Sequence, residues 1–101
     1  MKLLAIMGHE ETRLQVKRLF QEHQVSMISS MDIMGCNCEK SGLGQAWWPT
    51  DQMVGTYSSL CFAILDDEKA AAIMLELEKH PIAVEKDFPA RAFLMHVEKM
   101  V

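Results

Sequence analysis

The chain has 101 residues, half of them hydrophobic, and a formal charge of −4. This length fits one domain with a single core, and the apolar content is too high for a disordered tail. Lys and Arg are few and scattered, which argues against a nucleic-acid-binding protein. The apolar run Leu3 to Met7 is too short for a signal peptide or a membrane span. We therefore expect a cytoplasmic protein that does not insert into membranes.

The first part of the chain predicts a strand, a helix and a second strand. Residues Lys2 to Met7 are apolar on both faces, as in a central strand that is covered on both sides. A helix begins at Glu10 or Thr12 and runs to about His23. Its buried stripe consists of Val16, Leu19, Phe20 and His23. From Val25 to Met34 apolar residues alternate with more polar ones, which predicts a strand with one wetter face.

The last part predicts a strand, a helix and a strand. Ser58 to Leu65 is apolar on both sides, and Asp66-Asp67 ends this strand and caps the next helix. The buried stripe of that helix is Ala70, Ile73, Met74 and Leu77. Pro81 stops the helix, and Arg91 to Met100 is the final strand. Residues 1–101 thus form one α+β domain with a ferredoxin-like βαββαβ order and a four-stranded antiparallel sheet. Because two helices cover one sheet face, the second apolar face predicts oligomerisation.

A long segment, Gly35 to Tyr57, lies between the second and third predicted strands. It contains four of the five glycines and both tryptophans, and it has neither a helical nor a strand period. A loop this long in a small domain is usually functional or disordered. Trp47 and Trp48 either anchor a partner protein or pack back on their own subunit. We expect residues 38–54 to become ordered when they bind a ligand or partner.

Four segments resemble the nitrogen regulatory PII proteins and their PII-like relatives, over nearly the whole chain. They are Met1–Met7, Val25–Gly35, Ile64–Asp67 and Ala92–Val97, similar to the first, second, third and last strands of the family. The resemblance implies a homotrimer from which long T-loops, here residues 35–57, project. It also implies that small ligands, often adenine nucleotides, bind between subunits and set the T-loop conformation. The T-loop then docks on a membrane transporter, an enzyme or a regulatory protein.

The chain departs from that family just before its last strand. The glycine-rich B-loop of the family is absent, since Val84 to Arg91 contains no glycine. Phosphate binding in such loops depends on freely presented backbone amides, so we expect at most weak ATP binding. Arg91 stands where the family places a phosphate-contacting lysine, with Lys86 nearby, and Gly35 is at the base of the T-loop. These three are the expected ligand-binding residues. The CutA-type cation-tolerance trimers are the neighbouring alternative.

Cys36 and Cys38 place two thiols within reach of one metal ion. Two thiolates do not complete a tetrahedral zinc site but can hold soft Cu(I); the alternative is two reduced loop cysteines. Cys61, in a strand, is expected to be buried. Most of the nine methionines fit the core by their positions. Those assigned to the core are Met7, Met27, Met74 and Met95.

No catalytic constellation emerges from the sequence. His9, His80 and His96 are isolated along the chain and form no triad or ligand set. A small α+β-barrel monooxygenase shares the element order, but its sheet would need polar catalytic groups where this chain has Leu, Ile, Phe and Met. We therefore expect a PII-like signalling protein and not an enzyme. The second hypothesis is a CutA-like metal-tolerance protein that binds Cu or Zn through Cys36 and Cys38.

Overall fold

The computed structural model describes residues 1–35, 56–83 and 89–101. Their elements are β1 (Lys2–His9), the short 3-10 helix η1 (Glu10–Thr12), α1 (Arg13–Glu22), β2 (Ser29–Gly35), β3 (Thr56–Leu65), α3 (Asp67–Lys79) and β4 (Arg91–His96). This order confirms the predicted α+β, ferredoxin-like βαββαβ fold. The long segment between β2 and β3 is residues 36–55, which lie outside the described ranges.

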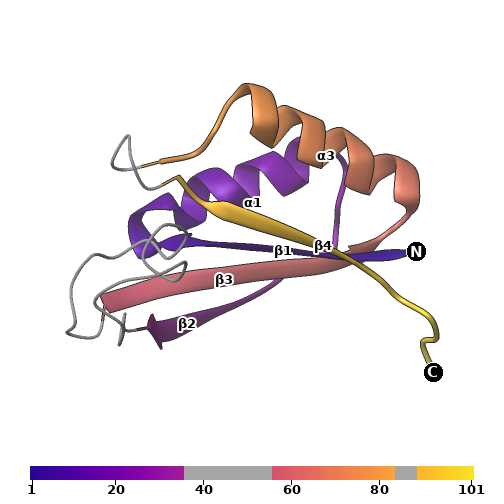
Figure 1. Ribbon diagram of the computed structural model, residues 1–101, viewed down its shortest axis with the longest axis horizontal. Coiled ribbons are helices and arrows are strands. Elements are labelled where there is room, and N and C mark those ends of the chain that lie inside the picture. The colour runs from indigo at the N-terminus through magenta and orange to yellow at the C-terminus, as the bar shows by residue number, and fades with distance from the viewer. Residues whose placement is uncertain (36–55, 84–88) are drawn as a thin grey trace, which may run out of the picture.

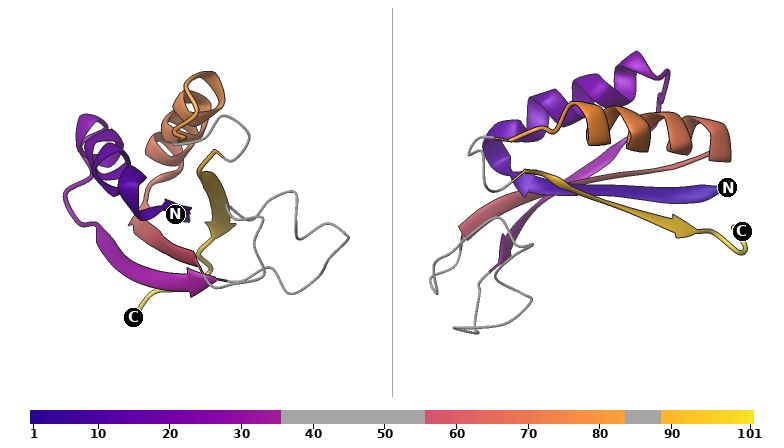
Figure 2. Two further views of the ribbon diagram at one scale, coloured as in Figure 1. Left: turned by 90° about the vertical axis from the view of Figure 1, so that its left-hand side faces the viewer. Right: turned by 45° about the horizontal axis from the view of Figure 1, so that its top comes forward.

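The four strands form one sheet in the order β2-β3-β1-β4, and every neighbouring pair is antiparallel. Helices α1 and α3 lie side by side on one face of this sheet (Figures 1 and 2). Both chain termini lie at one end of the sheet, while β2 ends and β3 begins at the other (Figure 1). The sheet therefore has a helix-covered face and a face that no described helix covers.

The core lies between the helices and the sheet. The central strands β1 and β3 contribute Leu4, Ile6, Cys61, Ala63 and Leu65 to it. The helices contribute Val16, Leu19, Phe20, Ala70 and Ile73, as predicted. His23, the other member of the predicted stripe on α1, is only partly buried. Met74 and Leu77 are partly buried and pack against this cluster. Fully burying one large aliphatic or aromatic side chain contributes roughly 1.5–3 kcal/mol, so this layer supplies most of the fold's stability.

Helix α1 ends in a two-bond cap that shortens the following strand. Gln24 adopts φ 57°, its amide donates to the Gln21 carbonyl, and the Val25 amide donates to the Phe20 carbonyl over 3.0 Å. This is the Schellman arrangement, in which the residue after the cap also makes an apolar contact with the helix. Val25 is accordingly buried in the core cluster. The prediction that β2 begins at Val25 is wrong by four residues, because Val25 belongs to the helix cap.

Helix α3 begins as predicted. The Asp66 side chain caps it by accepting a hydrogen bond of 2.8 Å from the Lys69 amide. Ala70 is fully buried, and its small side chain permits close packing. The ammonium group of Met1 donates to Asp67 Oδ1 at 2.8 Å, which connects the start of β1 to the first turn of α3. This hydrogen bond, with further help from the charge of the ammonium group, lowers the pKa of the Asp67 carboxyl.

Strands β1 and β4 differ from the prediction at their ends. Gly8 continues β1 instead of turning the chain, and a Cβ built on it would lie 3.0 Å from the Ala90 Cβ. The glycine therefore permits the residues before β4 to approach β1 closely. Strand β4 ends at His96, earlier than the predicted Met100. The Val97 amide then donates to the Met1 carbonyl over 3.1 Å.

Candidate functional site

The candidate site is the sheet face away from the helices, which we call the open face. Side chains alternate along strands, so the registers define which residues share this face. Its rows, read across the sheet, are Ile33–Ser58–His9, Met31–Leu60–Met7–Arg91, Ser29–Phe62–Ala5–Phe93 and Ile64–Leu3–Met95. Most of these side chains are apolar, and they form a continuous surface across all four strands.

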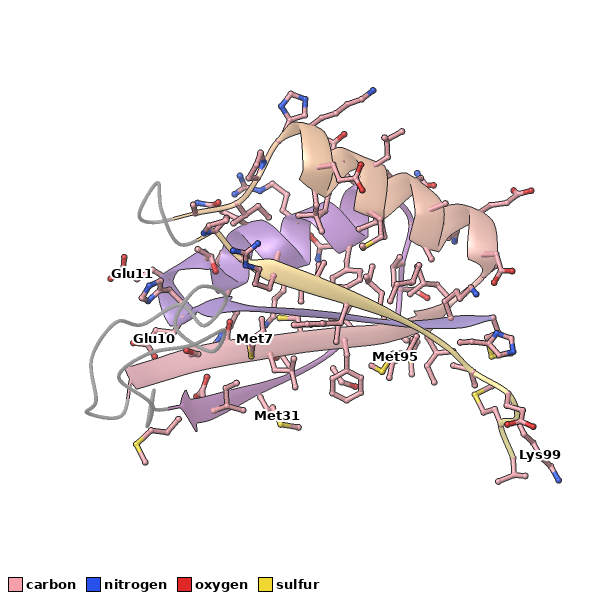
Figure 3. All side chains as sticks on the ribbon, in the orientation of Figure 1. Met7, Glu10, Glu11, Met31, Met95 and Lys99 are labelled. Carbon is pink, nitrogen blue, oxygen red and sulfur yellow. The ribbon has the colours of Figure 1, made fainter. Side chains whose placement is uncertain are left out.

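Large apolar side chains on the open face remain accessible. The exposed fractions are 49% for Met31, 45% for Ile64, 40% for Phe93 and 48% for Met95. Figure 3 shows Met31 and Met95 on the side of the sheet opposite the helices. Monomeric soluble proteins rarely expose contiguous apolar patches larger than a few hundred Å², and larger ones usually mark interaction sites. The open face is therefore a candidate interaction surface.

The structure corrects half of the methionine assignments. Met7 is buried and Met74 packs against the core, as predicted. Met27 is 81% exposed and Met95 is nearly half exposed, so their assignment to the core is wrong in this chain. Met27 lies in the connection before β2, outside any strand, and Met95 is on the open face. The alternation of side chains along each strand correctly predicted which residues share a face of the sheet. It did not predict which of the two faces the helices cover.

One end of the open face carries polar groups, which we call the Ser58 corner: His9, Ser58 and Arg91. Ser58 is fully buried, and its Oγ has no hydrogen-bond partner among the residues that the structure describes. His9 is directly opposite it on β1, and Arg91 is opposite Met7, two residues earlier on the same strand. A buried hydroxyl without a partner costs about 1–3 kcal/mol. A ligand or partner group that accepts from Ser58 would remove this cost.

The other end of the open face contains an apolar groove of about 570 Å³. Its lining includes Met1, Met27, Phe62, Ile64 and Met100. We call it the methionine groove. A volume of this size is in the range of small-molecule sites. The open face thus has a polar end near the start of β3 and a methionine-rich end near the two termini.

The helix-covered face of the sheet has fewer groups that could bind a ligand. Cys61 is fully buried, as predicted, and this burial raises the pKa of its thiol, an effect that Lys17 and Arg13 partly offset. Arg13 forms an ion pair with Asp32, which links the start of α1 to β2. Among residues 1–35, 56–83 and 89–101, no three His, Cys, Asp or Glu side chains are grouped so that they could hold a metal ion.

The predicted site residues fall into two groups. Arg91 lies on the open face at the start of β4, and Gly35 is the last residue of β2, paired with Thr56. Since β2 and β4 are the two edge strands, the structure does not bring these two residues together within one chain. The other predicted residues lie outside the described ranges: Cys36, Cys38, Trp47, Trp48 and Lys86.

The sequence analysis missed His9 and Ser58. His9 was treated as isolated, because its neighbour across the sheet is 49 positions away in the chain. A usable signal was the pair Ser58-Ser59, two hydroxyl residues at the start of an otherwise apolar strand. Both serines are buried, on opposite faces of β3.

No known family model matches the chain, and no curated protein is detectably similar to it in sequence. Among the described residues, no helix has the length and apolar character needed to cross a bilayer. The function is therefore inferred from the fold and from the open face.

Proposed function

We propose that this chain is a PII-like regulator, a homotrimer that senses a small ligand and acts on a membrane transporter or another protein. The observation that carries this proposal is the open face, an exposed apolar surface with polar groups at one end. The βαββαβ fold and the long segment between β2 and β3 are consistent with it. The segment 38–54, with Trp47 and Trp48, would contact the partner.

Assembly through the open face would remove its apolar side chains from water. Burial contributes roughly 25 cal/mol per Å² of apolar surface, and most soluble oligomers are closed and symmetric. The open face includes the half-exposed Met31, Ile64 and Met95. Charged side chains are few on it, because its rows contain Arg91 and His9 among mainly apolar residues. A second copy of the same face would therefore meet little charge repulsion.

The ligand of this regulator would be an anion bound at the Ser58 corner. The Arg91 guanidinium supplies positive charge and several donors, and the Ser58 hydroxyl supplies one more. Phosphate and carboxylate groups accept such hydrogen bonds, which are stronger when a donor is charged. Lys86 and Gly35 belong to the same proposed site, with Gly35 on the opposite edge strand. A site built between copies would allow both edges to contribute.

Binding of inorganic phosphate, ATP and small dicarboxylates to the full chain tests this proposal. We expect one of these anions to raise the melting temperature, and the dissociation constant to increase about tenfold in Arg91→Ala. Ser58→Ala should weaken the same anion. Arg18→Ala, which removes an exposed arginine on α1, is the control and should bind as the wild type does. An anion that binds equally to Arg91→Ala and wild type would place the ligand site elsewhere.

The CutA-like alternative depends on Cys36 and Cys38. No described residue favours it, because these cysteines are outside the described ranges and no suitable cluster exists within them. The double variant Cys36→Ser/Cys38→Ser separates the two functions. A regulator of the proposed kind keeps its anion response in this variant, whereas a tolerance protein of the alternative kind loses its metal.

A further inference from the structure

The methionine groove collects thioethers from three separate parts of the chain. Met1 precedes β1, Met27 lies in the connection between α1 and β2, and Met100 lies beyond β4. All three line the same groove, and they are 48%, 81% and 62% exposed. Hydrophobic burial therefore does not explain their positions within this chain. In the single chain these side chains are accessible from solvent.

Two hydrogen bonds hold the segments that bring these methionines together. The Val97 amide donates to the Met1 carbonyl, which connects the chain after β4 to the start of β1. The Met1 ammonium donates to Asp67 Oδ1, which fixes the same residue to α3. The side chains themselves remain adaptable, because methionine is unbranched and has three rotatable bonds. Their thioethers can therefore converge on an ion smaller than the groove.

The donor set selects a particular class of metal. Thioether sulfur is a soft ligand that favours Cu(I), whereas carboxylates and imidazoles suit harder or borderline ions. The one carboxylate lining the groove, Asp66, already accepts a hydrogen bond from the Lys69 amide as the cap of α3. Ser29 adds one hydroxyl, and the remaining lining side chains, such as Phe62 and Ile64, are apolar. Such a groove would disfavour Mg²⁺ and Ca²⁺, which require six or more oxygen ligands.

We propose that Met1, Met27 and Met100 form a binding site for a soft monovalent metal ion, Cu(I) or its analogue Ag(I). The site is distinct from Cys36 and Cys38. Because the groove lies at one end of the open face, the site requires that assembly through this face leaves the groove open to the ion. The competing explanation is that these methionines are apolar packing surface for another copy. Leucine distinguishes the two, because it replaces methionine in packing at small cost but has no sulfur.

The experiment is a competition titration of Cu(I) between the full-length chain and a chromophoric Cu(I) chelator, under anaerobic reducing conditions. The Cys36→Ser/Cys38→Ser variant serves as background, so that loop thiolates do not contribute. We expect this background to bind one equivalent of Cu(I) and no Zn(II). Met27→Leu and Met100→Leu should each weaken Cu(I) binding at least about tenfold.

The control is Met34→Leu, at an exposed methionine on the helix side of β2, outside the groove. It should bind Cu(I) as the background does. Absence of Cu(I) binding in the background would overturn the proposal. So would Leu variants that keep full affinity, or a loss of affinity in Met34→Leu as large as that in Met27→Leu.

Discussion

Strand β3 presents different side chains to the two sides of the sheet. Toward the helices the middle of the strand places Cys61 and Ala63, which are small and buried, and its end places the larger Leu65. On the open face it places Leu60, Phe62 and Ile64, which are large and keep part of their surface exposed. Small residues permit the helices to pack close to the sheet, whereas large residues project from it. The difference is consistent with the proposal that the open face packs against another copy of the chain.

The largest expected loss of stability follows a substitution on the helix-covered face of the sheet. Ile6→Ala removes a buried branched side chain from β1, and such truncations cost about 2–5 kcal/mol. The midpoint of urea unfolding should fall by the same amount at every protein concentration. Ile64→Ala, on the open face of β3, should lower the midpoint at concentrations where copies assemble and leave it unchanged where dilution has separated them. Equal, concentration-independent losses in both variants would mean that the two faces do not differ in this way.

Ile64→Lys should dissociate the assembly while the chain remains folded, because a charge in an apolar interface must be desolvated. Its control is Leu75→Lys on α3, since Leu75 is 50% exposed and Ile64 is 45% exposed. Leu75 is on the helix layer, so its variant should keep the wild-type mass. Light scattering and circular dichroism report the mass and the fold of each variant. Dissociation by Leu75→Lys alone would place the interface on the helices.

Ser58→Ala should change stability in the direction opposite to that of a core truncation. The buried Oγ has no hydrogen-bond partner within residues 1–35, 56–83 and 89–101, so its removal should stabilise the ligand-free protein by about 1 kcal/mol. The same variant should bind the anionic ligand more weakly. Thermal unfolding without ligand measures the first effect. A clear loss of stability would indicate that the hydroxyl is already hydrogen-bonded in the assembled protein.

The smallest effect concerns Asp67, whose pKa is below its ordinary 3.8 because of the Met1 ammonium. A lowered folded-state pKa contributes stability above the unfolded-state pKa, and this contribution disappears as the pH falls through the folded-state value. Asp67→Asn should therefore be slightly less stable than wild type at about pH 6 and equal to it at about pH 2. A difference that stays constant over this range would exclude the ion pair as its cause.

The sequence alone predicted the order of the helices and strands and most of the buried stripe on each helix. These features depend on local periodicity and capping, as for Asp66 at the start of α3. The start of β2 was wrong because the alternation from Val25 continues through residues that cap α1. The local pattern does not distinguish a strand from an extended cap. Likewise, the alternation of side chains along β4 did not predict that Met95 is on the face without helices.

The candidate site was predicted less completely than the fold. Arg91 was identified through the resemblance to the PII proteins, but its location on the open face depends on the pairing of β4 with β1. The Ser58 corner combines residues from β1, β3 and β4. The methionine groove likewise combines the two termini with the connection before β2. Such groupings depend on long-range strand registers, which one sequence does not specify.

The most direct test of the account is the mass of the wild-type protein in solution. The central claim is that copies of this chain cover the open face of one another. Light scattering at micromolar concentration should give three times the chain mass of 11.5 kDa. A stable, folded monomer of 11.5 kDa at that concentration would contradict the claim, because the apolar open face would then be tolerated in water without a partner.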